Sequence, residues 1–183
     1  IQGAVAAGIL GCGSVILGAS ETAGRLFLRV DALVKEKSLS LDEAASEVVR
    51  ELREHKQPIP GYGHPQHKAR DPRVARLFAV AAEAGASMHF VRIAEAVEKV
   101  VPSITGRYLR LNVSAAIPAL LLDVGFPAEA LKGVPILARC AGLIGHLTEE
   151  LSHPIGFALS YQATREQRYT GELPPGFTPH TAD

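Results

Sequence analysis

Apolar residues recur along this chain at steps of three and four, the spacing that places side chains on one face of an α-helix. The clearest case is residues 20–37, where the apolar face comprises Ala23, Leu26, Phe27, Val30, Leu33 and Val34. No segment shows the two-residue alternation that is typical of a half-buried strand. The periodicity therefore predicts an all-α fold.

Capping signals mark where several of these helices begin. Ser40 with Glu43 forms a capping box, in which each residue satisfies a backbone N–H near the other. Asp71 is a natural N-cap. Pro72 suits the first helical position, because proline has no backbone N–H and none is needed there. The expected helices span residues 20–37, 40–55, 71–85, 87–101, 112–124, 128–131 and 136–151.

The two ends of the chain have different patterns. Residues 1–10 are small and apolar and predict the end of a buried helix, which Gly11, Gly13 and Gly18 then interrupt. Pro102 is expected to close the helix before it. Residues 154–183 are rich in Gly and Pro and predict an irregular C-terminal tail. We expect residues 1–183 to form a single domain.

Composition argues against several classes of protein. Lysine and arginine together number 19, as do aspartate and glutamate, so no net charge favours nucleic acid or an anionic membrane as a partner. Gly, Ser and Pro interrupt the apolar stretches, and we expect no membrane span. Cys12 and Cys140 lie in apolar helical patterns and are expected to be reduced core residues. No signal peptide is evident, so a cytoplasmic protein is expected.

The chemistry of the sequence is concentrated in the segment from Pro60 to Arg73. Gly61 and Gly63 flank Tyr62, and glycine lets a backbone take positive φ or approach another group closely. His64 follows directly, and an imidazole on a loop can donate or accept a proton near neutral pH. A polar turn between two helices, with no further role, would have the same local composition.

This segment also carries a family resemblance. Gly-Tyr-Gly-His, followed by Lys and then Asp-Pro-Arg, resembles the signature of the citrate synthase superfamily. It is most similar to the citryl-CoA lyase branch, which includes the lyase module of ATP-citrate lyase. The resemblance implies a multi-helix domain packed as a homodimer, with the N-terminal part of the family fold absent here. It also implies an enzyme that makes or breaks the C–C bond between an acyl-CoA and a 2-oxo acid such as oxaloacetate.

The same resemblance assigns roles to particular residues. His64 would hydrogen-bond the carbonyl or hydroxyl oxygen of the oxo acid. Arg73, and Arg139 on a later helix, would bind substrate carboxylates, because a planar guanidinium suits a bidentate carboxylate. Lys68 would meet a phosphate of coenzyme A. The adenine and pantetheine channel would be lined by the backbone of Pro60, Gly61, Tyr62 and Gly63.

Two positions depart from the family pattern. The pattern Gly-Pro-X-His-Gly-Gly-Ala-X-Glu aligns with residues 13–21 and places Ile16 where the first catalytic histidine would stand. The Asn-Val-Asp segment aligns with residues 112–114 and places Ser114 at the position of the aspartate base. A hydroxyl is not a base at neutral pH without an activating partner. Asp123 has an acidic counterpart in the lyase branch, so the resemblance implies a structural residue. It lies about 13 Å further along the same helix and cannot reach the position of Ser114.

Three functional interpretations remain open. An acyl-CoA C–C lyase or acyltransferase is favoured by the resemblance. A homologue that binds coenzyme A and carboxylates but has lost turnover is favoured by Ile16 and Ser114. A helical dimerisation scaffold without a ligand is the third. His146 is expected to be structural. No metal is expected, because His67, His89, His153 and His180 show no cluster with metal-ligand spacing.

Overall fold

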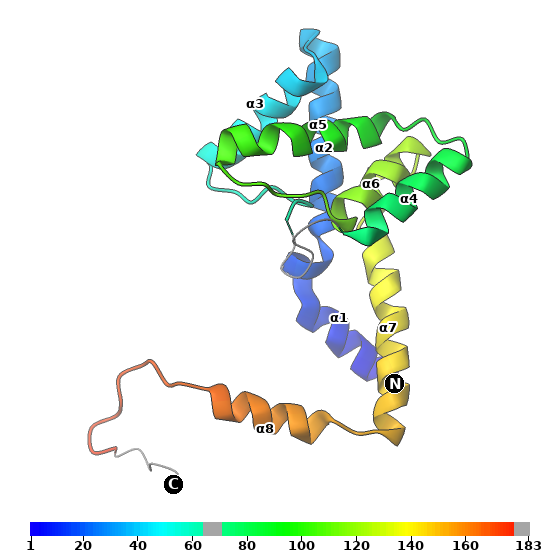
Figure 1. Cartoon of the computed structure of the whole chain (residues 1–183). Coiled ribbons are helices and arrows are strands. Elements are labelled where there is room, and N and C mark those ends of the chain that lie inside the picture. The colour runs from blue at the N-terminus through cyan, green and yellow to red at the C-terminus, as the bar shows by residue number, and fades with distance from the viewer. Residues whose placement is uncertain (64–70, 178–183) are drawn as a thin grey trace. The chain divides into compact units, whose positions relative to one another are not determined.

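The computed structural model describes residues 1–63 and 71–177, and its regular elements there are all helical. They are α1 (Gln2–Leu17), α2 (Ala19–Lys37), α3 (Leu41–Glu54), α4 (Pro72–Glu83), α5 (His89–Thr105), α6 (Val113–Asp123), the 3-10 helix η1 (Ala128–Ala130), α7 (Gly133–Ser152) and α8 (Gly156–Glu166) (Figure 1). Between these helices one isolated antiparallel bridge joins Tyr62 to Leu111. The predicted all-α class is confirmed.

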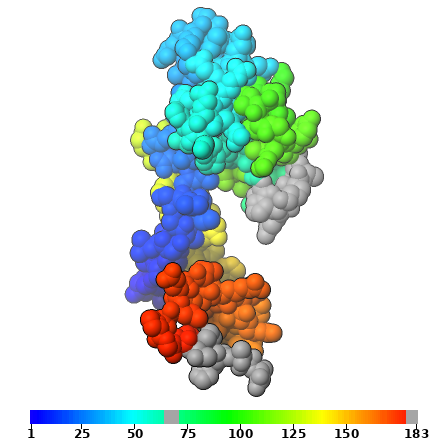
Figure 2. Space-filling view, turned by 90° about the vertical axis from the view of Figure 1, so that its left-hand side faces the viewer, coloured from blue at the N-terminus to red at the C-terminus, as the bar shows by residue number. Residues whose placement is uncertain are grey.

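The hydrophobic core lies in the first of two compact units, which comprise residues 1–143 and 144–183. Within the first unit α2 packs against α3 and α6, and α5 packs against the same two helices (Figure 1). Figure 2 shows α3 (cyan) and α5 (green) meeting in one continuous packed surface. The most completely buried apolar side chains include Phe27, Val30, Val48, Val49, Ile93 and Val97.

The predicted caps of α3 and α4 are present. Ser40 Oγ accepts a hydrogen bond from the Glu43 N–H (3.3 Å), and the Ser40 N–H donates to Glu43 Oε2 (2.9 Å). Asp71 accepts from the Arg73 N–H (3.1 Å), with Pro72 at the first position of α4. These signals were readable in the sequence because each cap joins residues only two or three positions apart.

Pro102 does not end α5, so the prediction of a helix closing at Val101 is wrong. The helix continues to Thr105 and ends at Gly106, which has φ of 69° and donates its N–H to the Pro102 carbonyl (2.9 Å). A proline removes one helical hydrogen bond, and buried neighbours can maintain the helix around it. Val100 and Val101, which are both buried, provide that packing.

The prediction of an irregular C-terminal tail from residue 154 is wrong over residues 156–166, which form α8. Glu150 explains where this helix begins. Its carboxylate accepts hydrogen bonds from the N–H groups of Ile155 (3.0 Å) and Gly156 (2.9 Å), and a carboxylate at a helix N-terminus is favourable. These hydrogen bonds lower the pKa of Glu150.

The side chains of α1 and α7 are much less covered than those of α2. Leu10 is 80% exposed and Leu137 is 73% exposed, so the predicted burial of residues 1–10 is wrong. The predicted glycine interruption is confirmed at Gly13, where φ is 58° and the helix is kinked. Cys12 and Cys140 are free thiols, as expected, but they are partly exposed rather than core residues.

Two helical stretches, 2–37 and 128–152, are long and apolar enough to cross a membrane by length and composition alone. The expectation that Gly, Ser and Pro leave no such stretch is wrong, because these residues do not lower the mean hydropathy enough. The core helix of a soluble protein passes the same test. The finding therefore assigns no membrane role by itself.

Candidate functional site

The Gly61–Gly63 loop is fixed to the segment that leads into α6. The Gly63 N–H donates to the Arg110 carbonyl (2.7 Å), and the Asn112 N–H donates to the Gly61 carbonyl (3.0 Å). Asn112 also donates from Nδ2 to the Gly63 carbonyl (2.5 Å). These bonds use both backbone polar groups of Gly63 and hold the glycine motif beside the start of α6. Sequence reasoning missed this pairing because Gly63 and Asn112 are 49 residues apart.

The two glycines of the loop are required by its conformation and by a close approach to α6. Gly61 and Gly63 have φ of 85° and 82°, values that most side chains make costly. A Cβ at Gly61 would lie 2.5 Å from the Cβ of Ala115. The loop therefore meets the first turn of α6 in direct backbone contact.

The Tyr62 side chain points into the core between these glycines. It is 7% exposed, and its hydroxyl donates to the Ala94 carbonyl (2.7 Å). Burial raises the pKa of Tyr62 well above its usual value, and the charge of Glu98 raises it further. A neutral, hydrogen-bonded phenol anchors the loop, so only the backbone of Tyr62 is left to face a ligand.

Asp71 connects the start of α4 to the start of α6. Its carboxylate accepts from Arg73 through Nε (2.9 Å) and Nη2 (2.8 Å), and from the Val113 N–H (3.1 Å). The hydrogen bonds from Arg73 lower the pKa of Asp71 to about 2 despite the opposing effect of burial. Arg73 is thus held as a cation next to the residue that begins α6.

Ser114 is the second residue of α6 and is partly exposed. Its N–H donates to Asn112 Oδ1 (2.8 Å), which caps the helix. A carboxylate at this position would sit near the positive end of the helix dipole, whereas a serine supplies only a hydroxyl. The structure therefore brings the glycine loop, the Asp71–Arg73 pair and Ser114 together around the start of α6.

A cavity of about 520 Å³ adjoins the glycine loop at Pro58 and Pro60. Its walls come from α2, α3 and residues 57–60, and they are mostly apolar. The polar groups around it include Arg25 and Arg29 of α2, which pair with Glu21 and Glu51. The full lining is Thr22, Arg25, Leu26, Arg29, Val48, Leu52, Gln57, Pro58 and Pro60.

Comparison with known proteins assigns this arrangement to a family. The family model described as citrate synthase, C-terminal domain, matches residues 1–155. The chain belongs to the citrate synthase family. A curated citrate synthase from Synechocystis sp. is 33% identical over 104 residues, which cover 54% of this chain and 26% of that protein.

Solved structures agree with this assignment. The citryl-CoA lyase of Hydrogenobacter thermophilus is 34% identical with a TM-score of 0.72, over 95% of this chain and 65% of that chain. An ATP citrate lyase of Methanosaeta concilii, solved in complex with (3S)-citryl-CoA, is 26% identical with a TM-score of 0.65, over 90% of this chain and 28% of that one. This citrate synthase family chain thus spans about a quarter of the curated relative and 65% of the lyase.

The remaining residues of the family pattern are not all part of this cluster. His64 and Lys68 lie outside the described residues. Ile16 on α1 is 57% exposed and is not a core residue of this chain. Arg139 on α7 is exposed and has no ion pair among the residues described. Because Arg139 is exposed, its charge remains solvated without an anionic partner.

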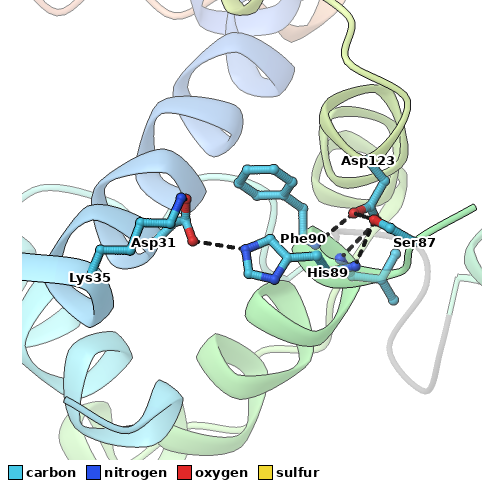
Figure 3. Close-up of polar contacts among 7 residues, drawn as sticks. Asp31, Lys35, Ser87, His89, Phe90 and Asp123 are labelled. Atoms are coloured by element: carbon cyan, nitrogen blue, oxygen red, sulfur yellow. Dashed lines mark hydrogen bonds and ion pairs between the residues drawn. The ribbon is translucent and has the colours of Figure 1, made fainter. Parts of the chain in front are cut away.

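Asp123 has the structural role that was predicted for it. Its carboxylate accepts from Ser87 Oγ (2.7 Å) and from the N–H groups of Phe90 (2.9 Å) and Val91 (3.3 Å), which begin α5 (Figure 3). Asp123 therefore caps α5 from the end of α6, and it faces that helix rather than Ser114.

His89 forms a second polar contact at the start of α5, which the sequence gave no sign of. Its Nε2 lies 2.8 Å from Asp31 Oδ1, and Lys35 Nζ donates to Asp31 Oδ2 (2.7 Å) (Figure 3). Burial raises the pKa of Asp31, but the hydrogen bonds from Lys35 and His89 outweigh it and the net shift is downward. The contact ties α5 to α2.

Metal ligands do not gather in the part of the chain that the structure describes. No group of three or more His, Cys, Asp or Glu side chains lies there in positions that could hold a metal ion. His146, which was expected to be structural, is exposed and lies 3.6 Å from Glu149 through Nδ1. The expectation that the protein uses no metal stays a prediction.

Proposed function

We propose that this chain is part of a citryl-CoA lyase-like or citrate synthase-like enzyme. The reaction makes or breaks the C–C bond between an acyl-CoA and a 2-oxo acid such as oxaloacetate. The observation that carries the proposal is the meeting of the glycine loop, the Asp71–Arg73 pair and Ser114 at the start of α6. ATP citrate lyases with this fold bind (3S)-citryl-CoA, or citrate and coenzyme A. Their ligands support the proposal that this chain binds the same molecules.

The chemistry assigns a task to each group. In the direction of synthesis a base removes the α-proton of the acyl-CoA, and the resulting enolate carbon attacks the ketone carbon of the oxo acid. The ketone oxygen becomes a hydroxyl by accepting a proton, and His64 is proposed to polarise that oxygen. Arg73 and Arg139 would bind carboxylates. Breaking the C–C bond follows the same steps in reverse.

Coenzyme A is proposed to lie along the glycine loop. The cavity beside Pro58 and Pro60 supports this proposal, because it is open, mostly apolar and adjacent to Arg25 and Arg29. An adenine ring suits an apolar wall, and phosphates suit guanidinium groups. Lys68 would supply a further cation.

A second candidate function is binding of coenzyme A and carboxylates without turnover. Ser114 favours it, because the hydroxyl has no hydrogen-bond partner among the described residues that would activate it. Ile16, at the position of the first family histidine, cannot transfer a proton. Loss of a general base typically lowers a rate by about 10²–10⁴-fold. Both candidates predict ligand binding, and they differ in proton transfer.

The test is exchange of the acetyl-CoA α-protons into deuterated water, followed by mass spectrometry. The enzyme proposal predicts exchange by the wild-type chain. Binding of coenzyme A without exchange would favour the silent binder. Ser114→Asp should then raise exchange by about 10²-fold or more, because it restores a carboxylate base. Ser114→Ala is the matched control and should change nothing. Failure of Ser114→Asp would mean that the alignment of α6 with the family helix is wrong.

The chain is also proposed to form a homodimer. Apolar side chains on α1 and α7 are exposed, among them Leu10, Val15 and Leu137. A second copy would cover such surfaces, which monomeric proteins rarely leave open. Light scattering during size-exclusion chromatography should give twice the chain mass. A monomer at micromolar concentration would contradict this proposal.

A further inference from the structure

The Asp71 carboxylate is the most heavily hydrogen-bonded group near the candidate site. It is 1% exposed and accepts four hydrogen bonds, from the backbone N–H, Nε and Nη2 of Arg73 and from the Val113 N–H. Capping α4 requires only the bond from the Arg73 N–H. The three additional bonds indicate that Asp71 has a role besides starting a helix.

The geometry of the Arg73 pair leaves part of the guanidinium outside it. Asp71 binds the edge formed by Nε and Nη2. A guanidinium has five N–H donors in a rigid plane, so the Nη1 side is not used by this pair. The Arg73 side chain is 52% exposed whereas the Asp71 side chain is 1% exposed. One edge is therefore held from inside the protein, and the other can meet an anion from outside.

We propose that Asp71 is a positioning residue, which fixes the Arg73 guanidinium so that its outward edge binds a carboxylate of the substrate. The inference rests on the proposed function. A free arginine side chain has considerable rotamer entropy, and a guanidinium that is already held loses less of it when a ligand binds. Asp71 also binds Val113, the residue before Ser114, and so sets the arginine relative to the start of α6.

The contrasting interpretation is that Asp71 only caps α4. Asp71→Asn separates the two, because asparagine caps a helix as well as aspartate. Arg73 donates from Nε to Asp71 Oδ1 and from Nη2 to Asp71 Oδ2. The amide replaces one of these oxygens with an NH₂ donor, so the bidentate pair with Arg73 is lost. Asp123→Asn is a matched control, since Asp123 also caps a helix but contacts no arginine in the described residues.

The experiment measures citrate and coenzyme A binding by calorimetry on the full chain. We expect Asp71→Asn to weaken citrate binding on the order of 10-fold, by analogy with groups that orient metal-binding side chains, and coenzyme A binding by less than about twofold. In an Arg73→Gln background Asp71→Asn should add no further loss, because the group it orients is absent. Asp123→Asn should leave both affinities unchanged.

Four results would overturn the inference. Equal weakening of both ligands would indicate a general structural defect, and full additivity with Arg73→Gln would show that Asp71 does not act through Arg73. Unchanged citrate affinity in Asp71→Asn, with normal wild-type binding, would overturn this inference alone. Absence of citrate binding by the wild-type chain would overturn the proposed function as well.

A measurement on the wild-type chain covers the case in which Asp71→Asn does not fold. The Arg73 Nε–H signal can be followed by ¹H–¹⁵N NMR during a citrate titration. If Asp71 keeps its edge of the guanidinium, the Nε–H signal stays in place while the Nη signals shift. A large shift of Nε–H would mean that citrate displaces Asp71, and the positioning role would be excluded.

Discussion

Helices α2 to α6 bury apolar side chains in the core, whereas α1 and α7 leave apolar side chains exposed. On α2, Phe27 and Val30 are fully buried although the helix also carries many charges. On α1, which is almost wholly apolar, Val15 is 90% exposed. An amphipathic helix shows which face its own chain covers. A helix that is apolar on every side shows only that some partner is needed, which here is proposed to be a second copy.

Among the substitutions considered, we expect the largest loss of stability at Phe27, in the buried face of α2. Phe27→Ala should lower the free energy of unfolding by about 3–5 kcal/mol, because it leaves a cavity in a close-packed core. Leu10→Ala should cost less than about 0.5 kcal/mol in the monomeric chain, because Leu10 is 80% exposed. Urea denaturation at a concentration where the chain is monomeric measures both. Equal losses of unfolding free energy in the two variants would show that Leu10 is buried, which would contradict the contrast between α1 and α2.

A somewhat smaller effect is expected where the glycine loop meets α6. Gly61→Ala should destabilise the chain by roughly 2–4 kcal/mol, combining a strained φ with overpacking against Ala115. Gly85→Ala is the matched control, because Gly85 also has positive φ (74°) but has open space around it. It should cost only about 1 kcal/mol. Similar losses in both variants, measured by thermal unfolding, would remove the argument for a close approach.

Acid should weaken the packed region through Asp71. Its pKa falls from 3.8 when unperturbed to about 2 in the folded chain, so its contribution is complete above pH 4 and is lost as the pH drops towards 2. The shift corresponds to about 2 kcal/mol. The difference in the free energy of unfolding between the wild type and Asp71→Asn, measured by urea unfolding between pH 7 and 2, should show this loss. A difference that did not change with pH would contradict it, and Glu83→Gln, an exposed site on α4, serves as the control.

The smallest effect is expected between α1 and the segment before α7. Lys132 Nζ donates to Ser14 Oγ (2.8 Å) in an exposed position. Lys132→Ala should change the free energy of unfolding by less than about 0.5 kcal/mol, because water replaces an exposed hydrogen bond. A loss above about 1 kcal/mol in urea denaturation would mean that α1 and α7 are held together more firmly than their exposure indicates.

Local features of the sequence predicted much of the fold. The caps at Ser40 and Asp71 were correct because their partners lie within three residues. The helix predicted over residues 20–37 was confirmed, because its apolar residues recur at steps of three and four and define one face. Errors arose where a single residue was given too much weight, as at Pro102, whose effect is overridden by the packing of Val100 and Val101.

Long-range contacts limited what could be predicted of the site. The motif indicated that Gly61, Gly63, Arg73 and Ser114 belong to one site, but not how they meet. That depends on Asn112 and Asp71, whose partners lie 49 and 42 residues away. The burial of Tyr62 was not predictable either, because its partner is the Ala94 carbonyl, 32 residues away. Periodicity carries no information on such pairs.

The bridge between Tyr62 and Leu111 has a consequence for the order in which the chain becomes functional. Closing a loop of about 50 residues costs roughly 3–4 kcal/mol of chain entropy before any contact compensates for it. The glycine motif is synthesised well before its partners at residues 110–115, and contacts between distant residues form slowly. A nascent chain that ends before Leu111 therefore contains every residue of the glycine motif but not the partners that hold the motif in its folded conformation.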